Sequence, residues 1–181
     1  MNKFAEPSLG FECEIPEGWV VLPGAWARTA KLTAAPTSEK AGELLHASTD
    51  EPFLSLSLPQ TDPMISIPMI QCTAKQLGVV QHMGGPAGVV DVVLGHLAGA
   101  YPDFQLLERE DPYLAAGSVG VYVKAAMSVL NEHGTRFPCI SELMVLMAPR
   151  YCLVIGFSGP ADLDKRPATD FDALVRSIRM R

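Results

Sequence analysis

The strongest constraint on this chain is a series of three alternating segments in its C-terminal third. Apolar residues recur at nearly every second position over 119–129, 136–147 and 151–158. A period of two is typical of a β-strand with one buried face. Turn-forming residues at 131–134 and 148–150 separate the segments. Because such short links join neighbouring antiparallel strands, the pattern predicts a three-stranded meander.

An amphipathic helix is predicted after the third segment. Its apolar residues are spaced at i, i+3, i+4 and i+7 and therefore share one helical face; they are Phe171, Leu174, Val175 and Ile178. We expect this helix to begin between Asp164 and Thr169 and to pack on the sheet.

A second helix is predicted over 86–100, because Pro86 suits a first-turn position and the following apolar residues recur at helical spacing. Gly88, Gly95 and Gly99 weaken this helix by about 1 kcal/mol each relative to alanine. We expect these glycines to permit close contact between the helix and the sheet. A short strand is predicted after it, over 104–110.

The N-terminal part is predicted to contain a β-hairpin. Residues 11–15 alternate in polarity, 16–18 form a turn, and 19–22 return. Residues 53–58 alternate and predict another strand. The apolar segment 64–71 is broken by Pro68, which favours an edge strand or a loop.

Size and charge limit the class of protein. The chain has 181 residues, of which 48% are hydrophobic and 19% charged, enough apolar content for one folded domain over 1–181. Residues 1–10 are expected to form a flexible tail. The net charge of -6 argues against nucleic acid as a partner. No apolar run reaches the length of a membrane span or has the form of a signal peptide, so no integral membrane segment is expected.

The four cysteines indicate a compartment. Cys13, Cys72, Cys139 and Cys152 lack the paired spacing of a metal site, and most lie in predicted strands. We expect buried free thiols, which are typical of a reducing environment such as the cytoplasm.

No catalytic, cofactor-binding or metal-binding motif is predicted. The run Gly156–Gly159 lacks the second glycine of a nucleophile elbow. The glycine-rich loop 84–88 precedes a helix and could bind an anion, but a plain loop explains it equally well. Cys72 and His82 could form a nucleophilic pair, without local support for it in the sequence.

One apolar segment is a candidate for contact with a partner. Met64, Ile65 and Met69 lie in the stretch broken by Pro68 and could form a rim that binds a peptide, since methionine adapts to varied apolar partners. Ordinary core filling is the alternative, and it is the preferred one.

The order of elements resembles the PsbP-like superfamily. The likeness covers roughly residues 11–22 and 86–178, and it is carried by the opening Ile15-Pro16-x-Gly18-Trp19 and by the closing strand 151–155 with its terminal helix. The resemblance implies an α+β fold, with a central antiparallel β-sheet flanked by helices, an N-terminal β-hairpin and a C-terminal helix packed on the sheet. It also implies a non-enzymatic binding role.

Among the branches of that superfamily, the sequence fits a cytoplasmic bacterial adaptor best, such as a chaperone of a secreted effector, since it has neither a transit peptide nor a lipobox cysteine. The expected partner is a protein or peptide, such as a secreted effector of type VI secretion or a membrane-associated protein, held at an exposed apolar patch. Two alternatives remain open: a small-molecule carrier or enzyme with a pocket between sheet and helices, and a structural subunit of a homo-oligomer.

Overall fold

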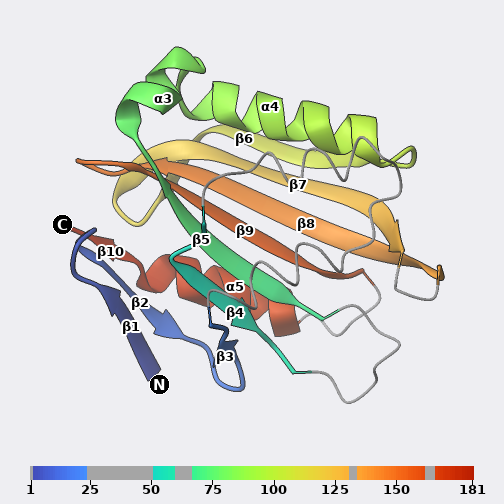
Figure 1. Cartoon of the computed structure of the whole chain (residues 1–181), viewed down its shortest axis with the longest axis horizontal. Helices are drawn as coiled ribbons and strands as arrows, with labels where there is room; N and C mark the ends of the chain where they lie inside the picture. The colour runs from blue at the N-terminus through green and yellow to red at the C-terminus, as the bar shows by residue number, and fades with distance from the viewer. Residues whose placement is uncertain (1, 24–50, 60–66, 131–133, 162–165) are drawn as a thin grey trace.

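The computed structural model describes residues 2–23, 51–59, 67–130, 134–161 and 166–181. It is an α+β fold built on a large antiparallel sheet with helices on its two faces (Figure 1). The sheet has the strand order β3-β4-β5-β9-β8-β7-β6. In that order its strands are Val20–Val21, Leu54–Ser57, Met69–Lys75, Cys152–Pro160, Arg136–Met147, Ser118–Leu130 and Gln105–Ala115.

The predicted meander is confirmed. β7 pairs with β8 and β8 pairs with β9, both antiparallel. The registers place Val121 opposite Val145 and Val145 opposite Val154. The predicted strand after the second helix also forms, and as β6 it extends to Ala115 along the outer edge of β7.

Both faces of the meander are covered, whereas the sequence pattern predicts one buried face. On one face, helix α4 (Gly85–Ala100) places Val89 and Val90 in a cluster with Val121, Val123 and Val145. The short helix α3 (Leu77–His82) adds Val80 to the same cluster. A two-sided cover explains why odd and even positions of β7 are both buried over 120–123.

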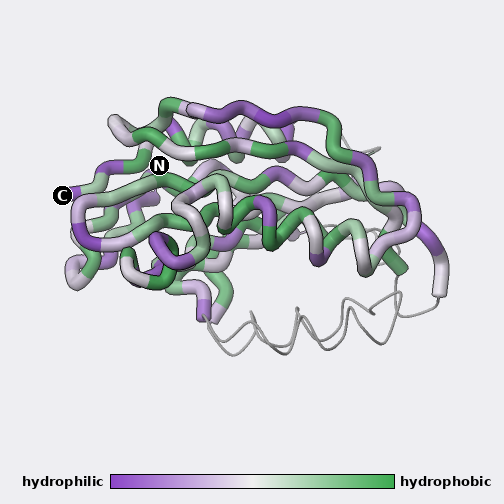
Figure 2. The backbone as a smooth tube through the Cα atoms, turned by 90° about the horizontal axis from the view of Figure 1, so that it is seen from above, coloured by the Kyte–Doolittle hydropathy of each residue, from purple (hydrophilic) through white to green (hydrophobic). Residues whose placement is uncertain are grey.

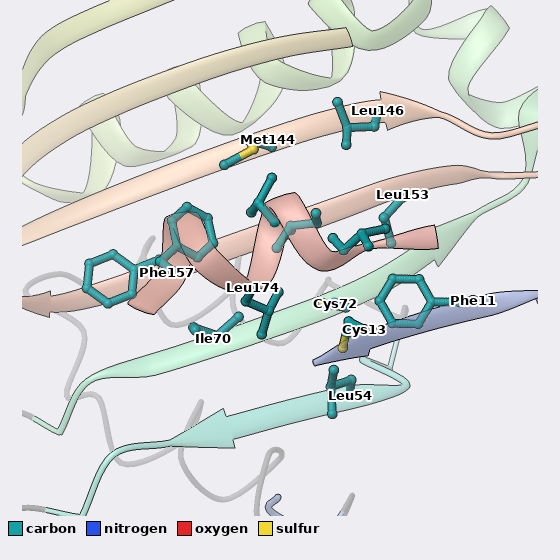
Figure 3. Packing of buried hydrophobic residues seen from close by; sticks show 14 of the residues in the cluster. Phe11, Cys13, Leu54, Ile70, Cys72, Met144, Leu146, Leu153, Phe157 and Leu174 are labelled. Atoms are coloured by element: carbon teal, nitrogen blue, oxygen red, sulfur yellow. The ribbon is translucent and has the colours of Figure 1, made fainter. Parts of the chain in front are cut away.

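On the other face, helix α5 (Arg166–Ser177) packs as predicted, and its Phe171 and Leu174 are fully buried, as is Ile178 directly after its last residue. Figure 3 shows Leu174 near Ile70 of β5, in a layer that also holds Phe157 of β9. The rings of Phe157 and Phe171 are stacked with centroids 5.4 Å apart. This apolar layer is what attaches the C-terminal helix to the sheet.

The N-terminal hairpin forms, but between different strands from those predicted. Strand β2 (Phe11–Ile15) pairs with β1 (Asn2–Glu6) and with β10 (Arg179–Met180) in a second sheet. The predicted return strand instead forms β3, which pairs with β4 of the large sheet. Trp19 lies between β2 and β3 in the sequence, and its side chain is buried in the core. The chain therefore leaves β2 at this point and does not return along it.

The flexible tail predicted over 1–10 is wrong for residues 2–10. Residues 2–6 are a strand with five register partners in β2, and the turn after it is closed by backbone hydrogen bonds from Leu9 N to Glu6 O and Gly10 N to Pro7 O. Phe4 packs against Phe11 and Phe53 with ring centroids 6.3 and 6.4 Å away. An anchored aromatic side chain and a full strand ladder order this segment.

The segment around Pro68 is likewise not an edge. β5 begins at Met69 and lies between β4 and β9, inside the large sheet. The proline precedes the first strand residue, so its missing N–H is not needed by the ladder, while its carbonyl accepts a hydrogen bond from Leu58 N. Met64 and Ile65 lie outside the described residues.

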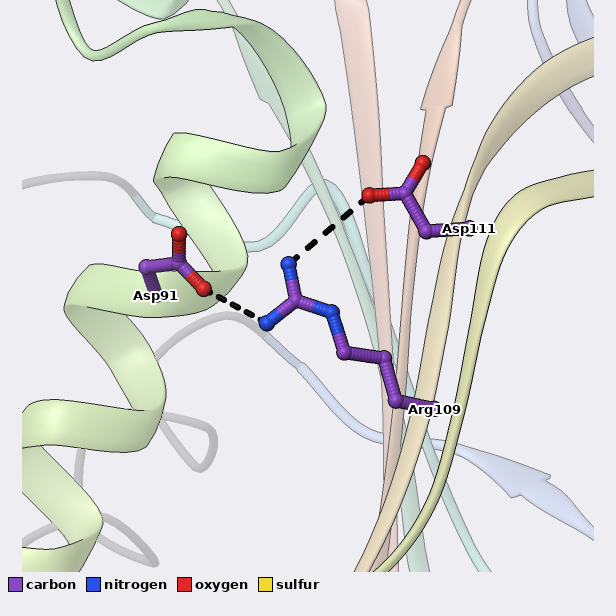
Figure 4. A network of polar contacts seen from close by, with 3 residues as sticks. All are labelled: Asp91, Arg109 and Asp111. Atoms are coloured by element: carbon purple, nitrogen blue, oxygen red, sulfur yellow. Dashed lines mark hydrogen bonds and ion pairs between the residues drawn. The ribbon is translucent and has the colours of Figure 1, made fainter.

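The edge strands of the large sheet are β3 and β6, and the β6 edge is charged. Residues 108–111 are Glu, Arg, Glu and Asp, followed by Pro112. Figure 4 shows Arg109 bridging from this edge to α4: its Nη1 lies 2.6 Å from Asp91 Oδ1, and its Nη2 lies 3.8 Å from Asp111 Oδ2. Charges and proline on an edge strand oppose pairing with another strand.

Helix α4 is apolar around most of its circumference. Figure 2 shows polar colours along it only at isolated positions, and Asp91 and His96 are its two polar side chains. The predicted role of its glycines in sheet contact is wrong. A Cβ at Gly88 would collide with the carbonyl of Met83, at the α3–α4 turn, whereas Gly95 and Gly99 face open space.

The α4 glycines generate a matched pair of stability predictions. Gly88→Ala should lower the free energy of unfolding by about 1–3 kcal/mol, because the new methyl overlaps backbone that must shift. Gly95→Ala should raise it by up to about 1 kcal/mol, since alanine favours helix and meets no neighbour. Urea unfolding followed by circular dichroism measures both; equal effects of the two substitutions would contradict the packing described here.

Asp170 joins α5 to the N-terminal segment. The indole Nε1 of Trp19 donates to Asp170 Oδ2 over 2.9 Å, and Arg166 Nε lies 3.5 Å from the same oxygen. Arg166 Nη2 also donates to the carbonyl of Glu17 over 2.7 Å. Asp172, two residues along, is exposed and makes no hydrogen bond or ion pair with the other described residues.

Asp170→Ala should therefore lower the free energy of unfolding by about 2 kcal/mol, because a buried indole donor loses its charged acceptor. Asp172→Ala removes the same charge from the same helix and should change it by no more than about 0.5 kcal/mol. Chemical denaturation monitored by tryptophan fluorescence compares the two variants. A loss for Asp172→Ala as large as that for Asp170→Ala would show that helix charge alone, and not the Trp19 contact, matters.

Candidate functional site

A groove follows one flank of α5 on the face of the sheet that this helix covers. Two hollows form it, of about 600 Å³ and about 360 Å³, and Asp172 lines both. The larger lies between α5, β10 and the β6–β7 turn, and is lined by Tyr113, Leu114 and Arg176 among others. The smaller lies between the start of α5 and strands β7–β9, and is lined by Lys124, Glu142 and Phe157 among others.

The helix wall of the groove arises from the helical repeat. Thr169, Asp172 and Arg176 lie three and four residues apart and so project from one flank of α5, beside the buried face that holds the helix to the sheet. Twelve residues of helix give a wall roughly 18 Å long. The site is thus positioned by the same packing that attaches α5.

The floor of the smaller hollow contains a buried carboxylate. Glu142 of β8 is 4% exposed and stands opposite Lys124 of β7 in the strand register. Lys124 Nζ lies 3.1 Å from Glu142 Oε1, and the hydroxyl of Tyr122 donates to Glu142 Oε2 over 2.9 Å. Both carboxylate oxygens therefore have partners, which is what burial of this charge requires.

Two tyrosines continue the floor into the larger hollow. The rings of Tyr113 and Tyr122 lie 5.3 Å apart, centroid to centroid, across strands β6 and β7. Burial, and next the Glu142 carboxylate, raise the pKa of Tyr122 above its ordinary range. Burial, and next Asp172, raise the pKa of Tyr113. Both phenols therefore stay protonated across the physiological range.

The methionine rim remains a prediction. Met64 and Ile65 lie outside the described residues, and Met69 is half-buried at the start of β5. Its neighbour Pro68 lines the smaller hollow.

The nucleophilic pair considered from the sequence is not formed. Cys72 is fully buried in the core of the α5 face, whereas His82 is exposed at the end of α3 with its Nδ1 2.9 Å from the carbonyl oxygen of Gly78. Neither residue, nor the loop 84–88, lines either hollow of the groove. All four cysteines are buried free thiols, as predicted, and burial raises the pKa of Cys13 to about 12 and of Cys139 and Cys152 to about 11.

The described residues contain no group of three or more histidine, cysteine, aspartate or glutamate side chains arranged to hold a metal ion. None of their helices combines the length and apolar character needed to cross a bilayer.

The sequence pattern does not single out the residues of the groove. In the sequence, Tyr122 and Lys124 are polar positions of an alternating strand, and Asp172 and Arg176 are charges near the two ends of a helix. One signal was available: a lysine and a glutamate each occupy a central position in a long apolar strand, where charge is unusual. Their cross-strand register, however, is not visible in the sequence.

Comparison with known proteins supports the fold. No protein-family model and no curated protein matches this sequence. LpqN of Mycobacterium tuberculosis, which is involved in cell envelope biogenesis, is 14% identical with a TM-score of 0.53, over 94% of this chain and 82% of its own. The cyanobacterial PsbP of Synechocystis sp. PCC 6803 is 12% identical with a TM-score of 0.53, over 99% of this chain and 92% of its own.

The yeast Ran-binding protein Mog1p, from Saccharomyces cerevisiae, is 11% identical with a TM-score of 0.50, over 99% of this chain and 94% of its own. At these identities the likeness concerns the fold. That fold is the PsbP-like one, as the sequence resemblance predicted.

The floor of the groove generates a rescue prediction. Lys124→Met should lower the free energy of unfolding by about 2 kcal/mol, because it leaves the Glu142 charge buried without its cation. Adding Glu142→Gln to that variant should restore most of the loss, since the amide carries no charge and still accepts from Tyr122. Denaturation midpoints of the single and double variants measure this; a double variant no more stable than Lys124→Met would contradict it.

Proposed function

We propose that this protein, which has the PsbP-like fold, is a non-enzymatic adaptor that holds a segment of a partner protein in the groove along α5. The observation that carries the proposal is the pair of adjoining hollows sharing Asp172, open along a rigid helix and floored by the sheet. Grooves between a helix and a sheet bind extended or helical peptides because both walls are preformed.

The groove offers mixed contacts to such a segment. At one end Leu114 lines it and is 75% exposed, the largest exposure among the large hydrophobic side chains of the described residues. The groove therefore offers an exposed apolar side chain beside polar ones.

Asp172 and Arg176 provide the polar part. They lie at i and i+4 with the acid toward the helix N-terminus, the arrangement that favours an ion pair on a helix. Yet within the described chain neither side chain has an ion-pair or hydrogen-bond partner. Both line the larger hollow, so both charges are available to a bound segment.

The narrower parts of the proposal concern the identity and place of the partner. A protein with this fold, Mog1p, is described as Ran-binding, which supports a protein partner as the class. A secreted effector or a membrane-associated protein are the two narrower candidates, and the role of LpqN in the cell envelope supports the second. The four buried thiols support a cytoplasmic site of action. Met64, Ile65 and Met69 are proposed as a rim of the same groove, because Pro68, in the same segment, lines the smaller hollow.

A photo-crosslinking experiment tests the proposal. Benzoylphenylalanine is placed at Ala168, which lines the smaller hollow, and in a control variant at Gln81, which is exposed on α3 on the opposite face of the sheet. Irradiation in cells should give one discrete heteromeric product from position 168 and none from 81. The product should recur with purified partner at one-to-one stoichiometry by light scattering.

Capture from position 81 but not from 168 would place the partner on the other face and end the proposal for this groove. A product from position 168 that has twice the mass of this chain would identify a second copy as the occupant, which supports the homo-oligomer alternative instead.

A further inference from the structure

We infer that the groove selects its partner through an arginine side chain, which would lie on the ring of Tyr113 with its guanidinium against Asp172. This inference rests on the proposed function, and it adds the chemistry of the segment that is bound.

The charges on the groove face are unbalanced toward the negative. Glu108 and Glu110 of β6 stand opposite Lys124 and Tyr122 in the register, and so project from the same face of the sheet as the groove floor. With Glu142 and Asp172 they make four carboxylates, against the three cations Lys124, Arg176 and Arg179. The pair of Lys124 and Glu142, at 3.1 Å, leaves three carboxylates against two arginines. Of these arginines, Arg179 already donates from Nη1 to the carbonyl of Ile178, so the remaining field attracts a cation.

Asp172 is the carboxylate free to receive it. Its side chain is exposed at the junction of the two hollows, and within the described residues it accepts no hydrogen bond and makes no ion pair. Glu142, by contrast, has both oxygens engaged by Tyr122 and Lys124. A cation entering the groove therefore finds its acceptor at Asp172.

The tyrosine floor favours arginine over lysine. Tyr113 lines the same hollow as Asp172, and its ring is backed by Tyr122 at 5.3 Å. The face of a neutral tyrosine ring attracts a cation lying over it. A planar guanidinium can stack on that face while its edge donates two hydrogen bonds to one carboxylate, which an ammonium group cannot do.

Fluorescence anisotropy with defined peptides tests the inference. The probes are fluorescein-labelled Gly-Ser peptides carrying three arginines, three lysines or three glutamates, titrated with the full chain at low salt. The arginine peptide should bind most tightly and the glutamate peptide least. Asp172→Asn should weaken the arginine peptide about fivefold, and Tyr113→Leu about threefold. Tyr113→Phe, which keeps the ring, should bind as the wild type does.

Glu17→Gln is the matched control, because it removes one exposed carboxylate outside the groove. It should leave the affinity unchanged; a loss equal to that of Asp172→Asn would mean general charge attraction and would overturn the inference. Equal binding of the lysine peptide, or displacement by free spermidine at the same concentration as by unlabelled arginine peptide, would also overturn it.

The two proposals fail separately. If the partner crosslinks at Ala168 and its affinity is unaffected by Asp172→Asn, the arginine inference is wrong and the groove remains the binding site. If no partner is captured at the groove, the proposed function itself is wrong, whatever the peptides do.

Discussion

The structure depends on covering both faces of one antiparallel sheet. Strands β7, β8 and β9 have apolar side chains on each side, and neither set can be left in water without a large loss of free energy. The segment between β5 and β6 supplies α3 and α4 for one face, while the end of the chain supplies α5 for the other. The order of elements along the chain follows from this requirement.

The groove exists because helix α5, which covers one face, is narrower than the sheet. α5 buries Phe171 and Leu174 in the apolar layer that includes strands β5 and β9, and its flank borders Tyr122, Lys124 and Glu142 of β7 and β8. An apolar floor there would remain exposed to water beside the helix. The ion pair and the tyrosines give a floor that tolerates partial hydration, and therefore can exchange water for a bound segment.

The N-terminal segment shows why local signals misassign partners. Residues 11–15, 16–18 and 19–22 have the polarity and turn chemistry of a hairpin. Trp19, however, gains more by entering the core, where its indole donates to Asp170, than the short return strand gains by pairing with β2. The free edges of β2 are then filled by residues 2–6 and by the last strand of the chain, neither of which has a strong strand pattern.

The sequence alone determined the elements with strong periodicity: the meander over 119–158, the helix over 86–100 and the amphipathic helix with Phe171 and Leu174. Their periods of 2 and 3.6 residues are local properties, visible within a window of ten or so residues. Tertiary structure alone decided how the N-terminal strands pair, that β5 is central, and that Lys124 meets Glu142 beside Asp172. These depend on register and packing between distant segments, and a one-residue slip, which no local pattern forbids, would separate every member of the site.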